Sequence, residues 1–215
     1  MYLEGSHSGL VRPLGERIYR KVSRVQISPP PLDIMKNILL IPGWGMRKVE
    51  LYNNDNLFEI RRGKLDKNSF SADYVIGLSL GALVALQNAR NIRGKIILIN
   101  PPIPKRSVVV WFFHWLDYLI NEGLFLERQK FIKNPIRWGL EIINCLKLLS
   151  TDFSKVFDNF PKEKFTVIRG KNDRFFCDEK AVKFLIDKNI NFIEVEGGHN
   201  WSEAIEKAIE NERQT

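Results

Sequence analysis

The chain has 215 residues, of which 44% are hydrophobic and 27% are charged, a balance typical of one globular domain rather than of a disordered or membrane-embedded chain. Its formal charge of +8 comes from 33 Lys and Arg against 25 Asp and Glu, which are scattered along the chain. The sequence shows no helix face on which basic and aromatic residues alternate, the pattern that would favour binding to nucleic acid. The two cysteines lack paired spacing, and no apolar run has the form of a signal peptide or a transmembrane helix, so we expect a cytoplasmic protein without a transmembrane segment.

Residues 1–34 carry no sustained helical or strand period and end in Ser28-Pro29-Pro30-Pro31. We expect them to be a disordered leader, and residues 35–215 to form the folded domain. One hypothesis is that Met35 is the true start, because Val25-Gln26-Ile27 followed by the prolines resembles a translated transfer-RNA 3′ arm. The alternative is a real, flexible arm.

Short apolar runs rich in β-branched residues predict buried strands. They lie at 35–41, 74–76, 95–100, 164–169 and 191–195. Helices are expected from about 80 to 92, 178 to 188 and 202 to 212, whereas residues 49–60 fit a hairpin or a short helix. Strands separated by helices of this length predict an α/β fold with a mostly parallel sheet flanked by helices.

Residues 103–161 contain no predicted strand, and helices are expected at about 107–121, 124–132 and 135–149. A helical insertion at this point of an α/β sheet would form a cap over the strand ends. Its segment 108–116 is rich in aromatic and branched side chains, so we expect Trp111, Phe112 and Trp115 to bind substrate together with Trp44. The alternative is that these side chains only anchor the cap.

The sequence Gly77-Leu78-Ser79-Leu80-Gly81 joins a predicted strand to a predicted helix, which is the context that a nucleophile elbow requires. The turn would expose the Ser79 hydroxyl and point the Leu80 amide at a developing oxyanion. After the first strand, Pro42-Gly43-Trp44-Gly45 is a glycine-rich loop, and we expect the Trp44 amide to be the second oxyanion donor. Ordinary glycine-flanked turns are the alternative for both motifs.

A serine hydroxyl needs a base with a pKa near neutrality to become a nucleophile. Of the three histidines, His7 lies in the leader and His114 in the cap, whereas His199 follows a strand and a Gly-Gly pair. Asp173 ends the loop after the preceding strand, at the same sheet edge, and could orient the base. A structural histidine and a turn-capping aspartate are the alternatives.

Together these motifs resemble the α/β-hydrolase superfamily, from Met35 to the C-terminus. The resemblance rests on Ile41-Pro-Gly-Trp-Gly45, Gly77-Leu-Ser-Leu-Gly81, Gly170-Lys-Asn-Asp173 and Gly197-Gly-His199, and on the order Ser, Asp, His. It implies a compact α/β-hydrolase fold with Ser79 as nucleophile, His199 as base, Asp173 as acid and the Trp44 and Leu80 amides as oxyanion hole. The glycine motifs look most like small carboxylesterases such as the pimeloyl-carrier-protein methyl ester esterases.

We therefore expect a serine hydrolase that cleaves a carboxylic ester or thioester through an acyl-enzyme on Ser79, with an apolar acyl or alkyl group. The substrate would be a small molecule or carried by a protein; no metal, no cofactor and no nucleic-acid partner is expected, and the sequence leaves the oligomeric state open. Three alternatives remain: an acyltransferase on the same fold, a non-catalytic ligand receptor, and a protein that touches membrane surfaces through the aromatic cap.

Overall fold

The computed structural model describes residues 37–43, 71–118, 120–121 and 143–214, all of which lie in the compact unit Met35–Thr215. The predicted leader at 1–34, the segment 49–60 and the cap helix at 124–132 lie outside these residues. Among the residues described, no helix combines the length and the apolar character needed to cross a lipid bilayer.

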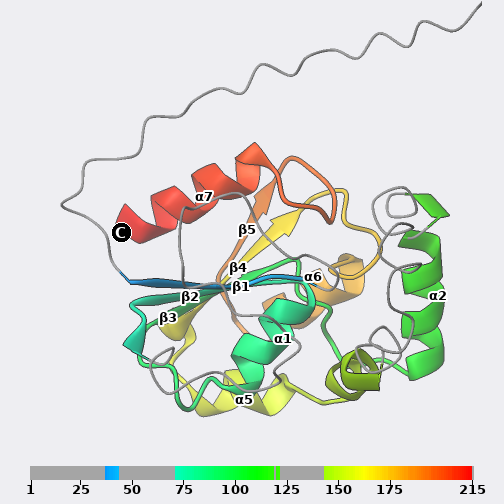
Figure 1. Cartoon of the computed structure of the whole chain (residues 1–215), viewed down its shortest axis with the longest axis horizontal. Coiled ribbons are helices and arrows are strands. Elements are labelled where there is room, and N and C mark those ends of the chain that lie inside the picture. Colours follow the sequence, from blue (N-terminus) through cyan, green and yellow to red (C-terminus); the bar gives the residue numbers. More distant parts are fainter. Residues whose placement is uncertain (1–36, 44–70, 119, 122–142, 215) are drawn as a thin grey trace, which may run out of the picture. The chain divides into compact units, whose positions relative to one another are not determined.

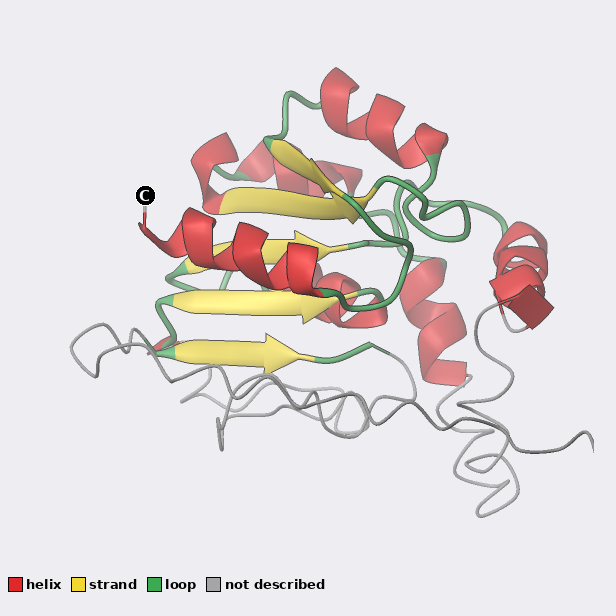
Figure 2. Cartoon of the chain, turned by 90° about the horizontal axis from the view of Figure 1, so that it is seen from above, coloured by secondary structure: helices red, strands yellow, loops and turns green. Residues whose placement is uncertain are grey.

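The core of this unit is one five-stranded sheet in which every neighbouring pair of strands is parallel (Figure 2). The strands follow one another across the sheet in sequence order. They are β1 (Ile38–Ile41), β2 (Tyr74–Leu78), β3 (Lys95–Ile99), β4 (Phe165–Gly170) and β5 (Phe192–Val195). The predicted α/β class with a parallel sheet flanked by helices is confirmed, because each apolar run became a strand.

Helices cover both faces of the sheet (Figure 1). The chain forms α1 (Leu80–Gln87), α2 (Val108–Tyr118), a helical stretch at 143–149, α5 (Ser154–Asn159), the 3-10 turn η5 (Lys162–Lys164), α6 (Glu179–Asp187) and α7 (Glu203–Gln214). Helices α1, α5 and α6 pack on one face, and α7 packs on the other. The strands β1, β2 and β3 are therefore buried on both faces, which explains why they read as nearly continuous apolar runs, whereas the edge strand β5 is only half-buried.

Alternate residues of each strand enter different cores. On β3, Ile96 and Leu98 belong to the core beneath α1, whereas Ile97 and Ile99 belong to the core beneath α7, and all four are 0% exposed. Burying such a side chain contributes about 1.5–3 kcal/mol, so both faces hold the sheet in register.

The predicted cap is helical where the structure describes it. Helix α2 corresponds to the helix expected at 107–121, residues 143–149 are the described end of the one expected at 135–149, and the described part of 103–161 contains no strand. Helix α5 was not predicted. It has only six residues, and it is stabilised by Phe157, which is fully buried against Phe165 of β4.

Candidate active site

Ser79 stands at the junction between β2 and α1, and its backbone φ is 52°. A non-glycine residue in this left-handed region is strained, and such strain persists only where the surrounding structure enforces it. Here the Ser79 amide donates to the carbonyl of Ile99 on β3 (2.8 Å). The junction is thus a sharp strand-to-helix turn, as expected for a nucleophile elbow.

The two glycines of the elbow are needed because other backbone segments lie against them. A Cβ added to Gly77 would lie 2.6 Å from the Cα of Ala82, and one added to Gly81 would lie 2.1 Å from the carbonyl oxygen of Ile41. The second contact brings the end of β1 against the start of α1. The loop that follows β1 therefore begins beside the serine turn.

His199 bridges the serine and the aspartate. Its Nε2 lies 2.9 Å from Ser79 Oγ, and its Nδ1 lies 2.7 Å from Asp173 Oδ2. An ionised carboxylate only accepts hydrogen bonds, so Nδ1 carries the proton and a neutral ring offers Nε2 as an acceptor to the serine hydroxyl. The structure brings together three residues that are separated by up to 120 positions in sequence.

Asp173 is completely buried, and its carboxylate is surrounded by donors. Oδ1 accepts from the amides of Phe175 (3.0 Å) and Phe176 (3.1 Å), and Oδ2 accepts from the amide of Cys177 (3.2 Å) and from His199. Burial alone would raise the pKa of Asp173, but the charge and hydrogen bond of His199 and the amides of Phe176 and Phe175 hold the pKa below its ordinary value. The carboxylate therefore stays ionised opposite the imidazole.

Cys177 lies directly behind this carboxylate and is also 0% exposed. Burial and the neighbouring Asp173 charge raise the pKa of the Cys177 thiol well above its usual range. The thiolate is the reactive form of cysteine, so Cys177 is a packing residue and not a competing nucleophile.

Residues 171–178, between β4 and α6, form the loop that carries Asp173 and are called the acid loop below. Aromatic rings from α2 and the acid loop enclose the imidazole. The ring centroid of Phe176 lies 4.5 Å from that of His199, and the ring of Tyr118 meets His199 edge-on at 5.5 Å. The Tyr118 hydroxyl also donates to Asn200 Oδ1 (2.9 Å). Helix α2 thus contacts the histidine directly, which restricts the motion of the ring.

An ion pair holds the residue Arg106, just before α2, to the end of the acid loop. Both terminal nitrogens of Arg106 donate to the carboxylate of Asp178, and the guanidinium lies over the Trp111 ring at 4.9 Å. Asp178 is also the N-cap of α6, where its side chain accepts from the amides of Lys180 and Ala181. Burial would raise the pKa of Asp178, but Arg106 and the Ala181 amide keep the pKa below its ordinary value.

The three aromatic residues predicted to bind substrate occupy different positions. Trp111 is 1% exposed and stacks on Phe176, so it faces the acid loop rather than solvent. Phe112 is 51% exposed, and half-buried Trp115 lies between Phe112 and the cluster around Trp111. Their contacts with substrate stay predictions.

Of the two expected oxyanion donors, only Leu80 lies in the described part of the chain. It is the first residue of α1, where backbone amides have no partner inside the helix. Trp44 lies outside the described residues. Its role as second donor stays a prediction, and so does its contact with substrate.

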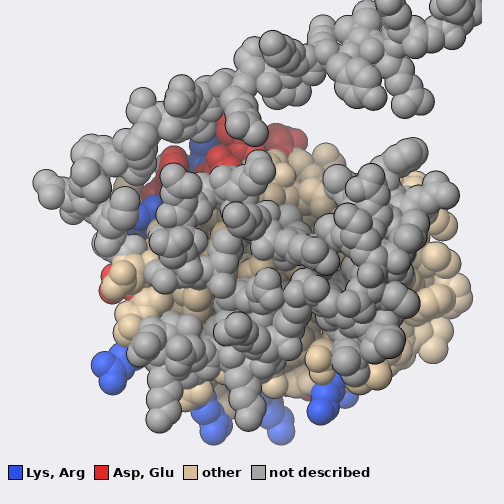
Figure 3. Space-filling model, viewed as in Figure 1, with Lys and Arg blue, Asp and Glu red and all other residues tan. Residues whose placement is uncertain are grey.

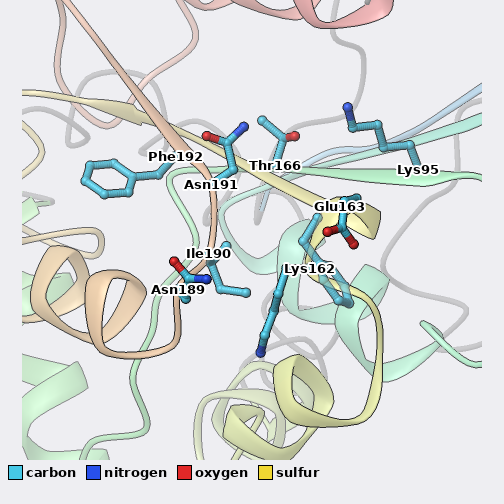
Figure 4. Close-up of a pocket in the computed structure, with 9 residues that line it drawn as sticks. Lys95, Lys162, Glu163, Thr166, Asn189, Ile190, Asn191 and Phe192 are labelled. Carbon is cyan, nitrogen blue, oxygen red and sulfur yellow. The ribbon is translucent and has the colours of Figure 1, made fainter.

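A separate cavity of about 590 Å³ opens at the opposite edge of the sheet, around the first residues of β3, β4 and β5 (Figure 4). Its lysines already have partners: Lys95 pairs with Glu212, and Lys162 donates to the carbonyl of Phe157 (2.5 Å). Within the described ranges, no group of three or more His, Cys, Asp or Glu side chains is placed to hold a metal ion. The serine site is therefore the best candidate for chemistry.

Sequence reasoning missed several residues that shape this site. Tyr118 and Phe176 were not singled out, although aromatic residues in a cap and directly after a candidate acid are a usable signal. Asn100, a polar residue at the end of a buried strand and before a proline, gave a similar signal. The pairing of Arg106 with Asp178 left no trace in the spacing, because 72 positions separate them.

A scan of protein-family models and a search of curated proteins each found no match to this sequence. Solved structures similar to this chain include a hydrolase from Pseudomonas aeruginosa PA01, which is 14% identical over 65% of this chain and 62% of that chain, with a TM-score of 0.43. A carboxylesterase of Nitrososphaera gargenis is 18% identical over 59% of this chain and 57% of that chain, with a TM-score of 0.39.

An N-formylmaleamic acid deformylase from Pseudomonas putida S16 is 15% identical over 80% of this chain and 91% of that chain, with a TM-score of 0.45. The chain spans less than two thirds of the length of the first two of these structures. At such identities and TM-scores, these likenesses say nothing about the activity of this chain.

Proposed function

We propose that this chain is a serine hydrolase of the α/β-hydrolase type that cleaves a carboxylic ester or thioester through an acyl-enzyme on Ser79. The observation that carries the proposal is the position of His199, whose two ring nitrogens lie 2.9 Å from Ser79 Oγ and 2.7 Å from Asp173 Oδ2. Serine nucleophile, histidine base and buried carboxylate in this arrangement constitute the recognised machinery of acyl transfer.

In the first half of the reaction, Nε2 of His199 takes the Ser79 proton while Oγ forms a bond to the acyl carbonyl carbon. The resulting oxyanion is held by the Leu80 amide and, as we propose from sequence, by the Trp44 amide. The imidazolium then gives its proton to the oxygen of the leaving alcohol or to the sulfur of the leaving thiol. The bond between the acyl carbon and the leaving group breaks, and the acyl-enzyme remains. The Asp173 carboxylate stabilises the imidazolium without being protonated.

In the second half, water takes the place of the alcohol. His199 removes a proton from the water, whose oxygen attacks the acyl carbonyl, and the proton is returned to Ser79 Oγ as the acid leaves. The products are a carboxylic acid and an alcohol or thiol. If another acceptor replaced water, the same steps would transfer the acyl group.

For the substrate, we propose an ester or thioester with an apolar acyl or alkyl group, either free or attached to a carrier protein. Phe176 and Tyr118 pack on the catalytic ring, and Phe112 and Trp115 continue the aromatic surface along α2. On the face shown in Figure 3, the described atoms visible on the side of α2 are uncharged, although α2 also carries the exposed acidic residue Asp117. Such a surface favours apolar groups over charged ones.

The test combines covalent labelling with turnover. A fluorophosphonate should label Ser79 in the unmodified protein, and the protein should hydrolyse short acyl esters. Ser79→Ala should lose labelling and lower the hydrolytic rate by on the order of 10⁴–10⁶-fold, as removal of a nucleophile does in other serine hydrolases.

Ser150→Ala is the matched control, because that hydroxyl donates to the Leu146 carbonyl of its own helix. It should keep both labelling and rate. Labelling without turnover of any ester or thioester would contradict hydrolysis, and near-normal turnover by Ser79→Ala would refute the mechanism altogether.

A further inference from the structure

Asn100 is the first residue after β3, and its side chain is fully buried with every polar group occupied. Its Oδ1 accepts from the amide of Gly170 (2.8 Å), and its Nδ2 donates to the carbonyls of His199 (2.8 Å) and Gly198 (3.2 Å). Its φ is 45°, in the left-handed region. Nothing in the chemistry proposed above uses this residue.

The three loops that carry the proposed triad meet at this strand end. The Ser79 amide donates to the carbonyl of Ile99, directly before Asn100 (2.8 Å). Gly170, whose amide binds the Asn100 side chain, accepts the Asp173 amide on its own carbonyl (2.9 Å). The loop that carries His199 is held because the carbonyls of Gly198 and His199 accept from the Asn100 side chain. The successive residues Ile99 and Asn100 therefore connect the segments that carry the nucleophile, the acid and the base.

The acid and base loops are also packed tightly together at this point. A Cβ on Gly170 would lie only 2.2 Å from the Gly198 carbonyl oxygen. The backbones of the two loops are therefore in direct contact at this point. The Asn100 amide bonds to both of them, and so it fixes their relative position.

The chemical demands at this position select asparagine. The site offers one amide donor and two carbonyl acceptors, and a primary amide supplies one acceptor and two donor hydrogens from a single short side chain. An ionised Asp would direct oxygens at the two carbonyls, and Ser or Thr has only one hydrogen to donate. Asn also tolerates a left-handed backbone better than most residues.

We infer that Asn100 is a positioning residue for the reaction: it sets the imidazole of His199 at hydrogen-bonding distance from both Ser79 and Asp173. This inference rests on the proposed function. Asn100 touches neither substrate nor reacting atoms, so its effect passes through the loop that carries the base. A shift of about 1 Å in such a group costs roughly 10²-fold in rate.

The first test is Asn100→Gly, which removes the amide and tolerates the left-handed backbone. We expect a folded protein in which kcat falls by roughly 10²-fold while KM changes by less than about twofold, because ground-state binding is untouched. Fluorophosphonate labelling of Ser79 should slow in parallel. The matched control is Asn189→Gly, at an exposed residue with φ 53° at the end of α6, and it should keep the normal rate.

The second test is Asn100→Asp, which covers the case in which the glycine variant does not fold. A protonated carboxyl keeps one donor and one acceptor, whereas the ionised form has no donor for the two carbonyls. The rate relative to the unmodified protein should therefore fall as the pH rises through the pKa of the introduced carboxyl. Over the pH range in which circular dichroism shows the variant to be folded, a purely structural role predicts a ratio that does not change with pH.

The third measurement is independent of turnover. Proton NMR of the ring N–H that His199 shares with Asp173 should show a protected signal in the unmodified protein and in Asn189→Gly, and a broadened or lost signal in Asn100→Gly. If the signal, the labelling rate and kcat all stay normal while only the melting temperature falls, the positioning role is wrong. If the unmodified protein cleaves no ester but the signal still depends on Asn100, the proposed function fails and the positioning role stands.

Discussion

At the scale of single residues, Asp173 shows how burial and charge are reconciled. A completely buried carboxylate would ordinarily favour its neutral form, but here three backbone amides and one imidazole donate to it. The chain doubles back within four residues to supply these amides, so the acid loop is built around the charge. The energetic consequence is a dependence of stability on pH.

That dependence has a defined sign. The pKa of Asp173 is lowered in the folded protein relative to an ordinary value of about 3.9 in the unfolded chain. The ionised carboxylate thus contributes stability that is fully present above the unfolded pKa and is lost as the pH falls through the folded pKa. The free-energy difference of unfolding between the unmodified protein and Asp173→Asn should be largest near neutrality and should shrink below about pH 4.

Urea titrations at a series of pH values measure this difference. The pKa of Asp178 is also lowered, by its partner Arg106, so Asp178 also makes stability depend on pH. The same titrations of Asp178→Asn measure the contribution of Asp178 separately from that of Asp173. A difference for Asp173→Asn that stays constant down to pH 2 would show that the carboxylate is not held ionised by the contacts described.

At the scale of the element, α2 is a helix with two apolar faces, only one of which is covered. Trp111 faces the acid loop, whereas Val109 and Phe113 are 63% and 62% exposed. Such a helix is not stabilised by amphipathic burial alone, and the Arg106–Asp178 pair and the Tyr118 contacts hold it in place. We propose that the exposed side chains of α2 contact the apolar part of the substrate.

We expect Phe112→Ser to weaken the preference for long acyl chains. Each fully buried methylene contributes about 0.8 kcal/mol, so partial burial of the four extra methylenes should raise kcat/KM by tens of fold from acetyl to hexanoyl esters in the unmodified protein. The variant should flatten this rise and leave acetyl ester turnover nearly unchanged.

Ile186→Ser is the comparison for this series, because Ile186 is an exposed apolar residue (61%) on α6 and should not affect the slope. If kcat/KM does not increase from two to six carbons even in the unmodified protein, α2 only packs against the fold and the apolar-substrate proposal is wrong.

At the scale of the whole molecule, the sheet could be predicted from sequence because its signal is local. The runs at 38–41 and 95–99 are apolar, β-branched and bounded by turn residues, and each became a strand. The turn around Ser79 could likewise be predicted, because the glycines that allow it are its immediate neighbours in sequence. Elements whose stability comes from a distant partner, such as the six-residue α5, gave no comparable signal.

The contacts that orient the site could not be predicted for the same reason. Asn100 reaches residues 70 and 99 positions away, and Arg106 reaches Asp178 over 72 positions. Sequence placed Ser79, Asp173 and His199 at one sheet edge, but hydrogen-bond distances depend on how the loops pack there. Residue spacing does not encode that packing.

The strands lie across the sheet in the order in which they occur in the chain, so the sheet can grow by adding one neighbour at a time. The serine and its base are nevertheless 120 positions apart and meet only once the last strand has docked. During refolding, secondary structure should therefore return before the reactivity of Ser79. Stopped-flow circular dichroism would time the first, and fluorophosphonate labelling quenched at successive times would time the second. Simultaneous recovery would contradict this order. An incompletely folded chain then carries an ordinary, unreactive alcohol, and stray acylation cannot begin before the fold is finished.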